Sequence, residues 1–537
     1  MSNEATCTGK SRVWASMWDE TGAVRKDPGG RLNIALVYPN TYWVGMSNLG
    51  LHTMYRVLNG HPSILCERFF TDSPRSVESS RALQDFHIVA FSVSYELDWV
   101  NMIRILIDNR IPVRAEERKG RPIVMAGGAA VTINPEPAAD ALDFCFLGEG
   151  EPLADALFDA FSSGGGYQGF LERLSHVTGV YVPAQTYPVY DGERIREFAG
   201  PRPVISVVQP FEEPGHSAIL TGRTVFQDMF LTEIARGCPF SCKFCTAREI
   251  YSPFRPVEVS RLTAILDKAA ASGRKLGLVS TSLNNHPRLP QLLEEIGARK
   301  LRIAPPSLRL GMLSEELLAY MKASGVNEVT LAPEVGSDTL RAALGKRVSG
   351  EAILEDVVSL VRSGIRDIKL YLMVGLPGEG QDDLEAAVDL VKRIRQTFIQ
   401  VSRGNRRIGR VSVSINAMVP KPHTQYEREA MLDPGEAKKR IRKIVKGLKS
   451  QSNVTVSFEG PKWAYIQALI ARGDRRVLDV LLEMAVSDQS RWQDVLKRWP
   501  RNPDYYALRR HDPDEILPWS FYSMPGPTPC GSGGGGA

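Results

Sequence analysis

Short apolar runs alternate with amphipathic stretches from Arg31 onward. Four strand-like runs lie at residues 32–39, 87–94, 121–130 and 142–150. Between them, the segment from Leu97 to Asp108 has the spacing of an amphipathic helix. Alternation of short apolar strands with helices is typical of parallel strands joined by crossover helices. The pattern therefore predicts a doubly wound α/β domain over residues 31–165, with ligands at the carboxyl ends of its strands.

A second alternating series begins near Thr232, after a connector (residues 166–224) that is rich in Gly, Pro and polar residues. Its six strand-like segments lie at 231–236, 276–281, 301–304, 328–333, 367–374 and 410–417. Helical segments separate them, for example at 260–272 and 382–396. Six βα units in series predict a partial (β/α)6 barrel of TIM type over residues 225–425, although strand count alone also allows a full barrel with two further units.

The remaining segments have weaker patterns. Residues 1–30 have no clear period and are predicted to form an N-terminal arm. Residues 426–520 become helical and basic, which predicts a helical C-terminal extension. Residues 521–537 end in GSGGGGA and read as a flexible tail.

Composition excludes some classes of protein. The 537 residues are 43% hydrophobic and 24% charged, which is ordinary for a globular chain, and the net charge of +5 demands no polyanionic partner. No run approaches the ~20 apolar residues that span a membrane. The first residues lack the basic start and apolar core of a signal peptide. We expect a cytoplasmic protein without a membrane partner.

Three of the seven cysteines lie within eight residues of one another, as Cys238, Cys242 and Cys245. The other four, Cys7, Cys66, Cys145 and Cys530, are scattered, as expected of buried or bystander thiols. The spacing C-x3-C-x2-C follows an apolar strand and enters a loop. Three thiolates on one loop can bind three irons of a [4Fe–4S] cluster and leave the fourth iron open. The alternatives are a zinc site, for which no fourth ligand lies nearby, and unmetallated core cysteines.

With Phe244 in the aromatic position, this loop resembles that of the radical SAM superfamily. The resemblance implies that the open iron chelates S-adenosylmethionine and that the reduced cluster cleaves it to a radical. It also implies an electron donor such as flavodoxin or ferredoxin. The later stretches at 461–465, 472–476 and 517–519 are similar to a poorly characterised bacterial group in which a cobalamin-binding-like domain precedes the barrel.

The same resemblance implies contacts to S-adenosylmethionine at the strand ends. They are Ser280 for the amino group, Glu334, Gly336 and Ser337 for the ribose and carboxylate, Arg341 for the carboxylate, and Gly375 and Pro377 beside the adenine. The alternatives are a solvated loop acid for Glu334, plain turn residues for the glycines, and a surface cation for Arg341.

The N-terminal domain resembles cobalamin-binding domains at four small residues. Ser92 and Ser94 end one strand, and Gly127 and Gly128 end the next. Only small residues let a backbone approach a large planar group closely. The Asp-x-His-x-x-Gly segment that supplies a cobalt-ligating histidine is absent, so cobalamin would lack that ligand. Ordinary turns of a doubly wound domain are the alternative, and His52 is predicted to be structural.

These observations favour a radical SAM enzyme that transfers a methyl group to an unactivated carbon with the help of cobalamin. One alternative is a cobalamin-independent radical SAM enzyme that modifies RNA or a peptide, with the basic helix around 438–449 in contact with it. That run is also typical of a solvated helix face. A second alternative is a non-catalytic iron–sulfur sensor. The sequence does not identify the substrate.

Overall fold

The computed structural model describes residues 18–118, 120–209, 211, 213–402 and 409–526. The first 17 residues of the predicted arm, the tail from residue 527 onward, and with them Cys7 and Cys530, lie outside the described residues.

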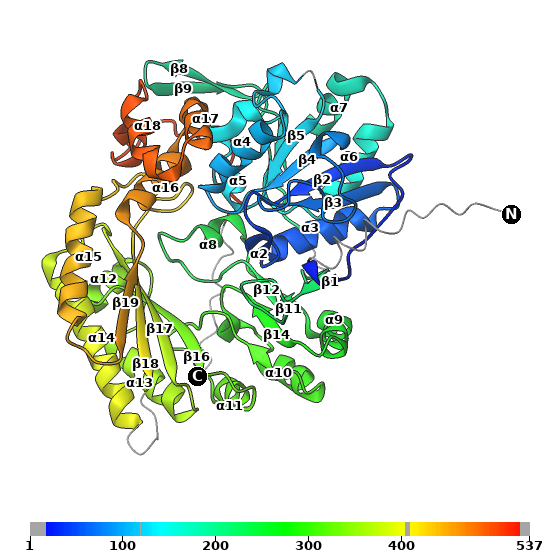
Figure 1. Ribbon diagram of the computed structural model, residues 1–537. Helices are drawn as coiled ribbons and strands as arrows, with labels where there is room; N and C mark the ends of the chain where they lie inside the picture. The colour runs from blue at the N-terminus through cyan, green and yellow to red at the C-terminus, as the bar shows by residue number, and fades with distance from the viewer. Residues whose placement is uncertain (1–17, 119, 210, 212, 403–408, 527–537) are drawn as a thin grey trace, which may run out of the picture.

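A six-stranded sheet forms the N-terminal domain (Figure 1). Its strands are β2 (Leu32–Val37), β3 (Ile64–Phe69), β4 (Ile88–Ser92), β5 (Ile123–Gly127), β6 (Phe144–Phe146) and β7 (Val180–Tyr181). The order is β3-β2-β4-β5-β6-β7, and all pairings are parallel except β6 with β7. This doubly wound order confirms the predicted fold class and places a topological switch point between β2 and β4.

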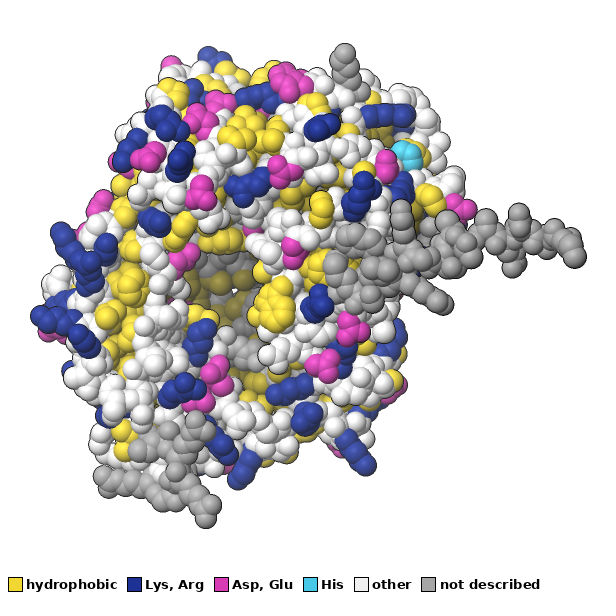
Figure 2. Space-filling model, in the orientation of Figure 1, with side chains coloured by type: hydrophobic (Ala, Val, Ile, Leu, Met, Phe, Trp, Pro, Cys, Tyr) yellow, Lys and Arg dark blue, Asp and Glu magenta, His cyan; other side chains and the backbone are white. Residues whose placement is uncertain are grey.

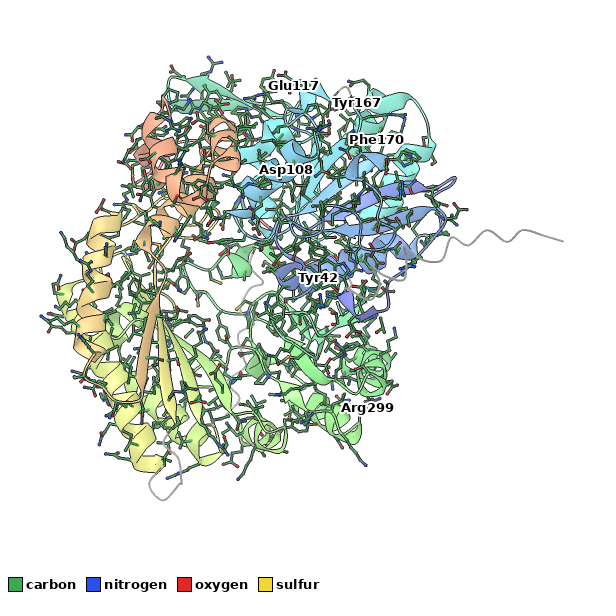
Figure 3. All side chains as sticks on the ribbon, viewed as in Figure 1. Tyr42, Asp108, Glu117, Tyr167, Phe170 and Arg299 are labelled. Atoms are coloured by element: carbon green, nitrogen blue, oxygen red, sulfur yellow. The ribbon has the colours of Figure 1, made fainter. Side chains whose placement is uncertain are left out.

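Helices cover both faces of this sheet because each face is apolar. One core joins the sheet to α3 (Leu49–Gly60), α6 (Leu153–Ser162) and α7 (Gly166–Ser175). Figure 3 shows Tyr167 and Phe170 coming from α7, which covers the sheet beyond the predicted boundary at residue 165. The opposite face carries α4 (Asp98–Asp108) and α5 (Ala129–Ile133).

Strand β3 was not predicted, because Glu67 and Arg68 interrupt its apolar run. Both side chains are buried, at 3% and 1% exposure. Arg68 pairs with Glu20, 48 positions away in the chain, and with Glu78 in the loop after the strand, and Glu67 accepts a hydrogen bond from Ser79. Buried charges of this kind are tolerated only when they are paired.

The barrel consists of two parallel sheets. One contains β11 (Met229–Glu233), β14 (Lys275–Val279) and β15 (Ile303–Ala304), and the other contains β16 (Glu328–Glu334), β17 (Asp367–Val374), β18 (Arg410–Ala417) and β19 (Val454–Phe458). A parallel bridge between Leu308 and Leu331 links them. Within the described ranges β19 does not pair with β11, so the barrel is partial, as predicted, and β19 adds a seventh strand that the sequence analysis missed.

The outer helices of the barrel share one core with its strands. These helices are α9 (Val259–Ala271), α10 (Leu289–Ala298), α11 (Glu315–Ala323), α13 (Gly350–Arg362), α14 (Gln381–Val401) and α15 (Pro434–Leu448). In β17, Ile368, Leu370, Leu372 and Val374 are buried in this core and the alternate residues face away from it. That alternation follows from the two-residue period of a strand.

Several short elements complete the fold. They are β1 (Glu20–Thr21) paired with β10 (Leu220–Thr221), the hairpin β8 (Tyr187–Asp191) and β9 (Arg194–Ala199), α2 (Tyr42–Gly45), and, beside the cysteines, β12 (Ala235–Arg236), α8 (Thr246–Ile250), β13 (Arg255–Pro256) and α12 (Asp338–Ala343).

The last helices return to the N-terminal domain. They are α16 (Pro461–Arg472), α17 (Leu478–Val486), α18 (Trp492–Arg498) and α19 (Pro503–Ala507). Figure 1 shows them beside α4 and the β8–β9 hairpin, and Figure 2 shows the molecule hollowed at its centre, between the N-terminal domain and the two halves of the barrel. Within the described residues, every helix is too short or too polar to span a bilayer.

Candidate radical-generating site

The cysteine loop leaves a two-stranded antiparallel ribbon formed by β12 and β13. Gly237 begins the loop with a φ of +80°, and a Cβ there would lie 2.5 Å from the carbonyl oxygen of Tyr251. Both the backbone angle and this close approach require glycine. Cys238, Cys242 and Cys245 follow as free thiols, with Cys242 buried and the other two half-buried.

The three thiols lie on one short loop. In the part of the chain that the structure describes, no three His, Cys, Asp or Glu side chains converge closely enough to hold one metal ion. In a cubane cluster each thiolate binds a different iron, so the sulfurs need not converge on a point.

Polar and aromatic contacts support the loop. The Arg309 Nη1 atom lies 3.6 Å from the Cys242 Sγ atom, and the guanidinium lies 3.8 Å from the ring centroid of Phe240. A cation beside a thiolate stabilises its charge. Burial raises the pKa of the Cys245 thiol, with smaller contributions from Cys242 and Cys238. Binding of iron would therefore displace a proton from this thiol.

Phe244 joins the cysteine loop to the carboxyl ends of the later strands. It packs on a small core that contains Val335 and Leu340 after β16, Leu376 after β17 and Met418 after β18. The segments that follow β16, β17 and β18 therefore meet around the cysteine loop, as expected where parallel strands end at one rim.

The residues after β16 make contacts within the protein. Glu334 has a φ of +66° and pairs with Lys346, with 2.5 Å between Oε1 and Nζ. A Cβ on Gly336 would lie 1.9 Å from the backbone nitrogen of Ala387 in α14, so close packing requires this glycine. Ser337 caps α12 by accepting a hydrogen bond from the Leu340 N–H.

Arg341 is fully buried, which contradicts its reading as a surface cation. Its Nη atoms donate to the carbonyl oxygens of Val335, Gly336 and Val348 and to the Asp338 carboxylate. Burial lowers the pKa of its guanidinium. Its Nε atom has no hydrogen-bond partner among the described residues, whereas both Nη atoms are used by the protein.

An ion pair between Glu379 and Arg440 holds the turn after β17. The Gly375 N–H donates to the Glu379 Oε2 atom over 2.7 Å, and Arg440 of α15 lies 2.6 Å from the same oxygen. Gly375 has a φ of +84°, which favours glycine, and Pro377 is half-buried in this turn. Sequence reasoning did not identify Arg440 because its partner lies 61 positions away.

One cavity of about 440 Å³ lies between the N-terminal domain and the barrel. Its walls contain the predicted cobalamin residues Ser92, Ser94, Gly127 and Gly128, together with Gly237 and Ser280 of the barrel. The sequence placed these residues at separate strand ends, and the structure brings them to a common space. The volume is within the range of sites that hold small molecules and cofactors.

His52 is not available to this cavity as a metal ligand. Its Nε2 atom lies 3.0 Å from the Met46 carbonyl oxygen, and its Nδ1 atom lies 3.2 Å from the Ala218 backbone nitrogen. Burial lowers its pKa to about 4. Both ring nitrogens are used by the protein, in agreement with the structural role predicted for it.

Two family models match the chain. "Radical SAM proteins, N-terminal" matches residues 50–183, and "Radical SAM superfamily" matches residues 232–391. An uncharacterized protein of Methanocaldococcus jannaschii is 28% identical over 83% of this chain and 89% of its own length.

Two further comparisons concern proteins with described activities. The ribosomal protein uS12 methylthiotransferase RimO of Moorella thermoacetica is 24% identical over 61% of this chain and 78% of its own. The solved structure of the cobalamin-dependent S-adenosylmethionine radical enzyme OxsB, with aqua-cobalamin and S-adenosylmethionine bound, aligns with a TM-score of 0.47 at 15% identity, over 90% of this chain and 65% of its own.

The superfamily match begins at Thr232, covers the cysteine loop and runs through β17 into α14. The N-terminal match covers β4 to β6, whose carboxyl ends line the cavity. The chain is a member of the radical SAM superfamily, an enzyme whose cofactors are a [4Fe–4S] cluster and S-adenosylmethionine.

Proposed function

We propose that this enzyme binds its cluster through Cys238, Cys242 and Cys245 and transfers a methyl group to an unactivated carbon, with cobalamin held between its two domains. The observation that carries the proposal is the cavity of about 440 Å³, whose wall includes both Ser94 of the N-terminal domain and Gly237, the neighbour of Cys238. A ligand in this cavity would lie beside the cysteine loop.

When bound, the cluster would supply an electron for cleavage of S-adenosylmethionine, and cobalamin would carry the methyl group. The residues of the chain orient these groups and exclude water. Asn48 donates to the Ser94 Oγ atom over 3.1 Å, which ties the start of α3 to the end of β4 across the switch point. The deeper wall is apolar, with Leu36, Leu58 and Met125 among its residues.

The strand-end residues are assigned to S-adenosylmethionine in the same proposal. Ser280 lines the cavity near Gly237 and is assigned to the amino group. Glu334, Gly336 and Ser337 are assigned to shaping the rim after β16. Gly375 and Pro377 present backbone to the adenine. Since the Nη donors of Arg341 hold the 335–348 segment, we propose that it supports this rim and does not contact the ligand itself.

The test is anaerobic purification with iron, sulfide and hydroxocobalamin, followed by dithionite and S-adenosylmethionine. We expect bound iron and cobalamin, with formation of 5′-deoxyadenosine or S-adenosylhomocysteine. Replacement of all three cysteines with alanine should give a colourless protein, and iron that persists in that variant would contradict the ligand assignment.

Cobalamin binding has its own test. Ala129→Phe adds a ring to the cavity wall at the start of α5 and should lower retained cobalamin about tenfold without changing iron content. Cobalamin that washes from the wild-type protein while iron remains would contradict methyl transfer by this route.

A second candidate is modification of RNA or a peptide without cobalamin. Lys438, Arg442 and Lys446 of α15 and Lys449 at its C-terminal cap are exposed, while Arg440 and Lys443 pair with acids near α14. The similarity to a methylthiotransferase that acts on a ribosomal protein also favours it. S-adenosylmethionine cleavage that needs added RNA or peptide, and not cobalamin, would support this candidate.

The family matches favour an enzyme over the sensor alternative.

A further inference from the structure

Glu149 lies in the loop that follows β6, in the N-terminal domain, and its side chain is almost completely buried at 3% exposure. Its carboxylate accepts hydrogen bonds from both Nη atoms of Arg255, at 2.9 Å for Nη1, and from the Val208 N–H at 2.8 Å. The Arg236 Nη1 atom lies 3.1 Å from its Oε2 atom. Four donors from the rest of the chain therefore occupy one carboxylate.

The two arginines stand on either side of the cysteine loop. Arg236 ends β12 two residues before Cys238, and Arg255 begins β13 ten residues after Cys245. They are directly paired in the β12–β13 ribbon, so the loop begins and ends at this pair. A single carboxylate from the N-terminal domain thus binds both ends of the segment that carries the three thiols.

The carboxylate of Glu149 neutralises the repulsion between the positive charges of Arg236 and Arg255. Two adjacent guanidiniums repel each other unless anions lie between them. Arg236 also pairs with Glu151 and with Glu233, but among the described residues Glu149 is the only carboxylate that pairs with Arg255. The ring of Phe211 covers both guanidiniums, at 4.4 Å from Arg236 and 5.8 Å from Arg255. Removal of Glu149 would leave the buried Arg255 without an ion partner in the part of the chain that the structure describes.

We infer that Glu149 is a positioning residue that locks the cysteine loop to the N-terminal domain through Arg236 and Arg255. The same side chains Glu149 and Arg236 line the cavity, so the lock also sets where the loop lies relative to a ligand bound there. The effect of Glu149 on catalysis rests on the proposed function, in which the three cysteines bind the cluster. The contacts of Glu149 with Arg236 and Arg255 are present without a cluster.

The test is hydrogen–deuterium exchange on the full-length protein, purified without a cluster, as Glu149→Gln. Glutamine keeps the volume and removes the charge. We expect amides of residues 236–250 to exchange about tenfold faster than in the wild type. The matched control is Glu78→Gln, which removes an equally buried partner of an arginine, Arg68, in the same domain but away from the loop. Its exchange over 236–250 should not change.

Exchange over 236–250 within about twofold of wild type in Glu149→Gln, or equally accelerated in Glu78→Gln, would overturn the assignment. Glu149→Asp keeps the charge on a side chain that is one methylene shorter, and should lose part of the protection, only over 236–250. If Glu149→Gln does not fold, a similar failure of Glu149→Asp would identify Glu149 as a general stability residue, whereas a folded Glu149→Asp with local loss of protection would support the lock.

A second readout uses the reconstituted cluster. Glu149→Gln keeps all three cysteines, so we expect wild-type iron content with a broadened electron paramagnetic resonance signal and about tenfold weaker binding of S-adenosylmethionine. An unchanged spectrum and affinity would contradict the positioning role. Iron that persists after replacement of the three cysteines would instead refute the proposed ligands, and would leave the exchange result standing.

Discussion

At Gly345 the backbone has a φ of +85°, and a Cβ there would lie 2.3 Å from the carbonyl oxygen of Ser241, inside the cysteine loop. The neighbouring Leu344 carbonyl oxygen accepts a hydrogen bond from the Lys243 N–H over 3.0 Å. Glycine at this position lets the segment after α12 pack directly against the backbone of the cysteine loop. The sequence offered no local sign of this contact, because Gly345 lies 100 residues beyond Cys245.

Gly345→Ala should therefore lower iron incorporation after anaerobic reconstitution, because the methyl group displaces the loop. Gly364→Ala is the matched control, since Gly364 has a φ of +100° with no atom within 4 Å of an added Cβ. Both variants should lose about 1–2 kcal/mol from the left-handed backbone angle. Iron content measured by colorimetric assay should fall only in the first variant, and an equal fall in both would contradict the contact.

Helix α4 shows how one element can carry a pH response. Asp98 begins this helix, and its Oδ1 atom accepts hydrogen bonds from Asn40 over 2.9 Å and from Asn101 over 3.3 Å. Burial raises its pKa from 3.8 to about 6, despite these hydrogen bonds. The folded protein thus holds this proton more tightly than the unfolded chain does.

The contribution of Asp98 to stability is fully present below pH 3.8, and it is lost as the pH rises through about 6. Asp98→Asn removes the titration and keeps an oxygen acceptor. The free energy of unfolding of this variant, relative to wild type, should rise by about 2–3 kcal/mol between pH 4 and pH 7. Urea unfolding at several pH values measures it, and parallel pH profiles for the two proteins would contradict the assignment.

At the scale of the whole molecule, the last helices of the chain pack against the N-terminal domain. Leu481 and Met484 of α17 share one hydrophobic core with Trp99 and Ile103 of α4. The last helices therefore complete the layer on one face of the N-terminal sheet, and they do not extend the barrel. Within the described part of the predicted C-terminal extension, α15 and β19 belong to the barrel.

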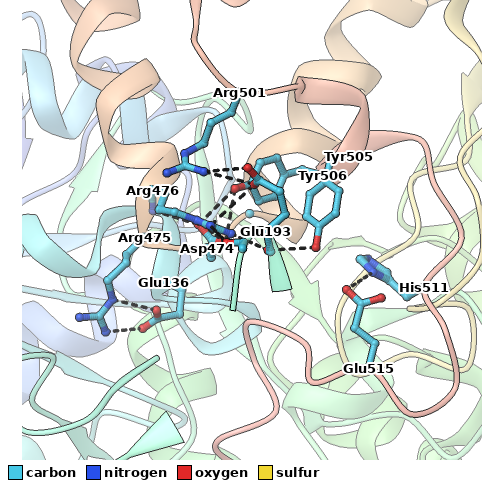
Figure 4. A network of polar contacts seen from close by, with 12 residues as sticks. Glu136, Glu193, Asp474, Arg475, Arg476, Arg501, Tyr505, Tyr506, His511 and Glu515 are labelled. Atoms are coloured by element: carbon cyan, nitrogen blue, oxygen red, sulfur yellow. Dashed lines mark hydrogen bonds and ion pairs between the residues drawn. The ribbon is translucent and has the colours of Figure 1, made fainter. Parts of the chain in front are cut away.

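Arg475 joins the last helices to the N-terminal domain through an ion pair with Glu136 (Figure 4). Its Nε and Nη2 atoms lie 3.1 Å and 3.0 Å from the oxygens of Glu136, whose side chain is fully buried. Tyr181 of β7 lies 3.0 Å from the Arg475 Nη2 atom. Burial raises the pKa of Glu136, so its charged form depends on this partner.

Arg475→Met should cost about 3–5 kcal/mol in the free energy of unfolding, because it leaves Glu136 buried without its cation. Arg501→Met is the control, since Arg501 pairs with Glu193 at an exposed site and should cost less than about 1 kcal/mol. Chemical denaturation of the two variants makes the comparison. Similar losses in both would show that the buried pair does not anchor the last helices.

The sequence by itself determined the layout of the two α/β domains. The apolar run Ile88–Ser92 and the alternating strand Asp367–Val374 were found because burial of one or both faces on a sheet produces these two patterns. The cysteine spacing was also readable, since three thiols on one loop form a local pattern. Strand β3 was missed, because its buried charges are satisfied by partners that only the folded chain brings near.

Only the tertiary structure decided how the strand ends combine. It brought Ser94, Gly128, Gly237 and Ser280 to one cavity, and it used the Nη donors of Arg341 for internal bonds. It also joined the last helices to the first sheet. Local patterns record which residues avoid water, whereas a cavity wall or a buried ion pair depends on contacts between residues that are hundreds of positions apart.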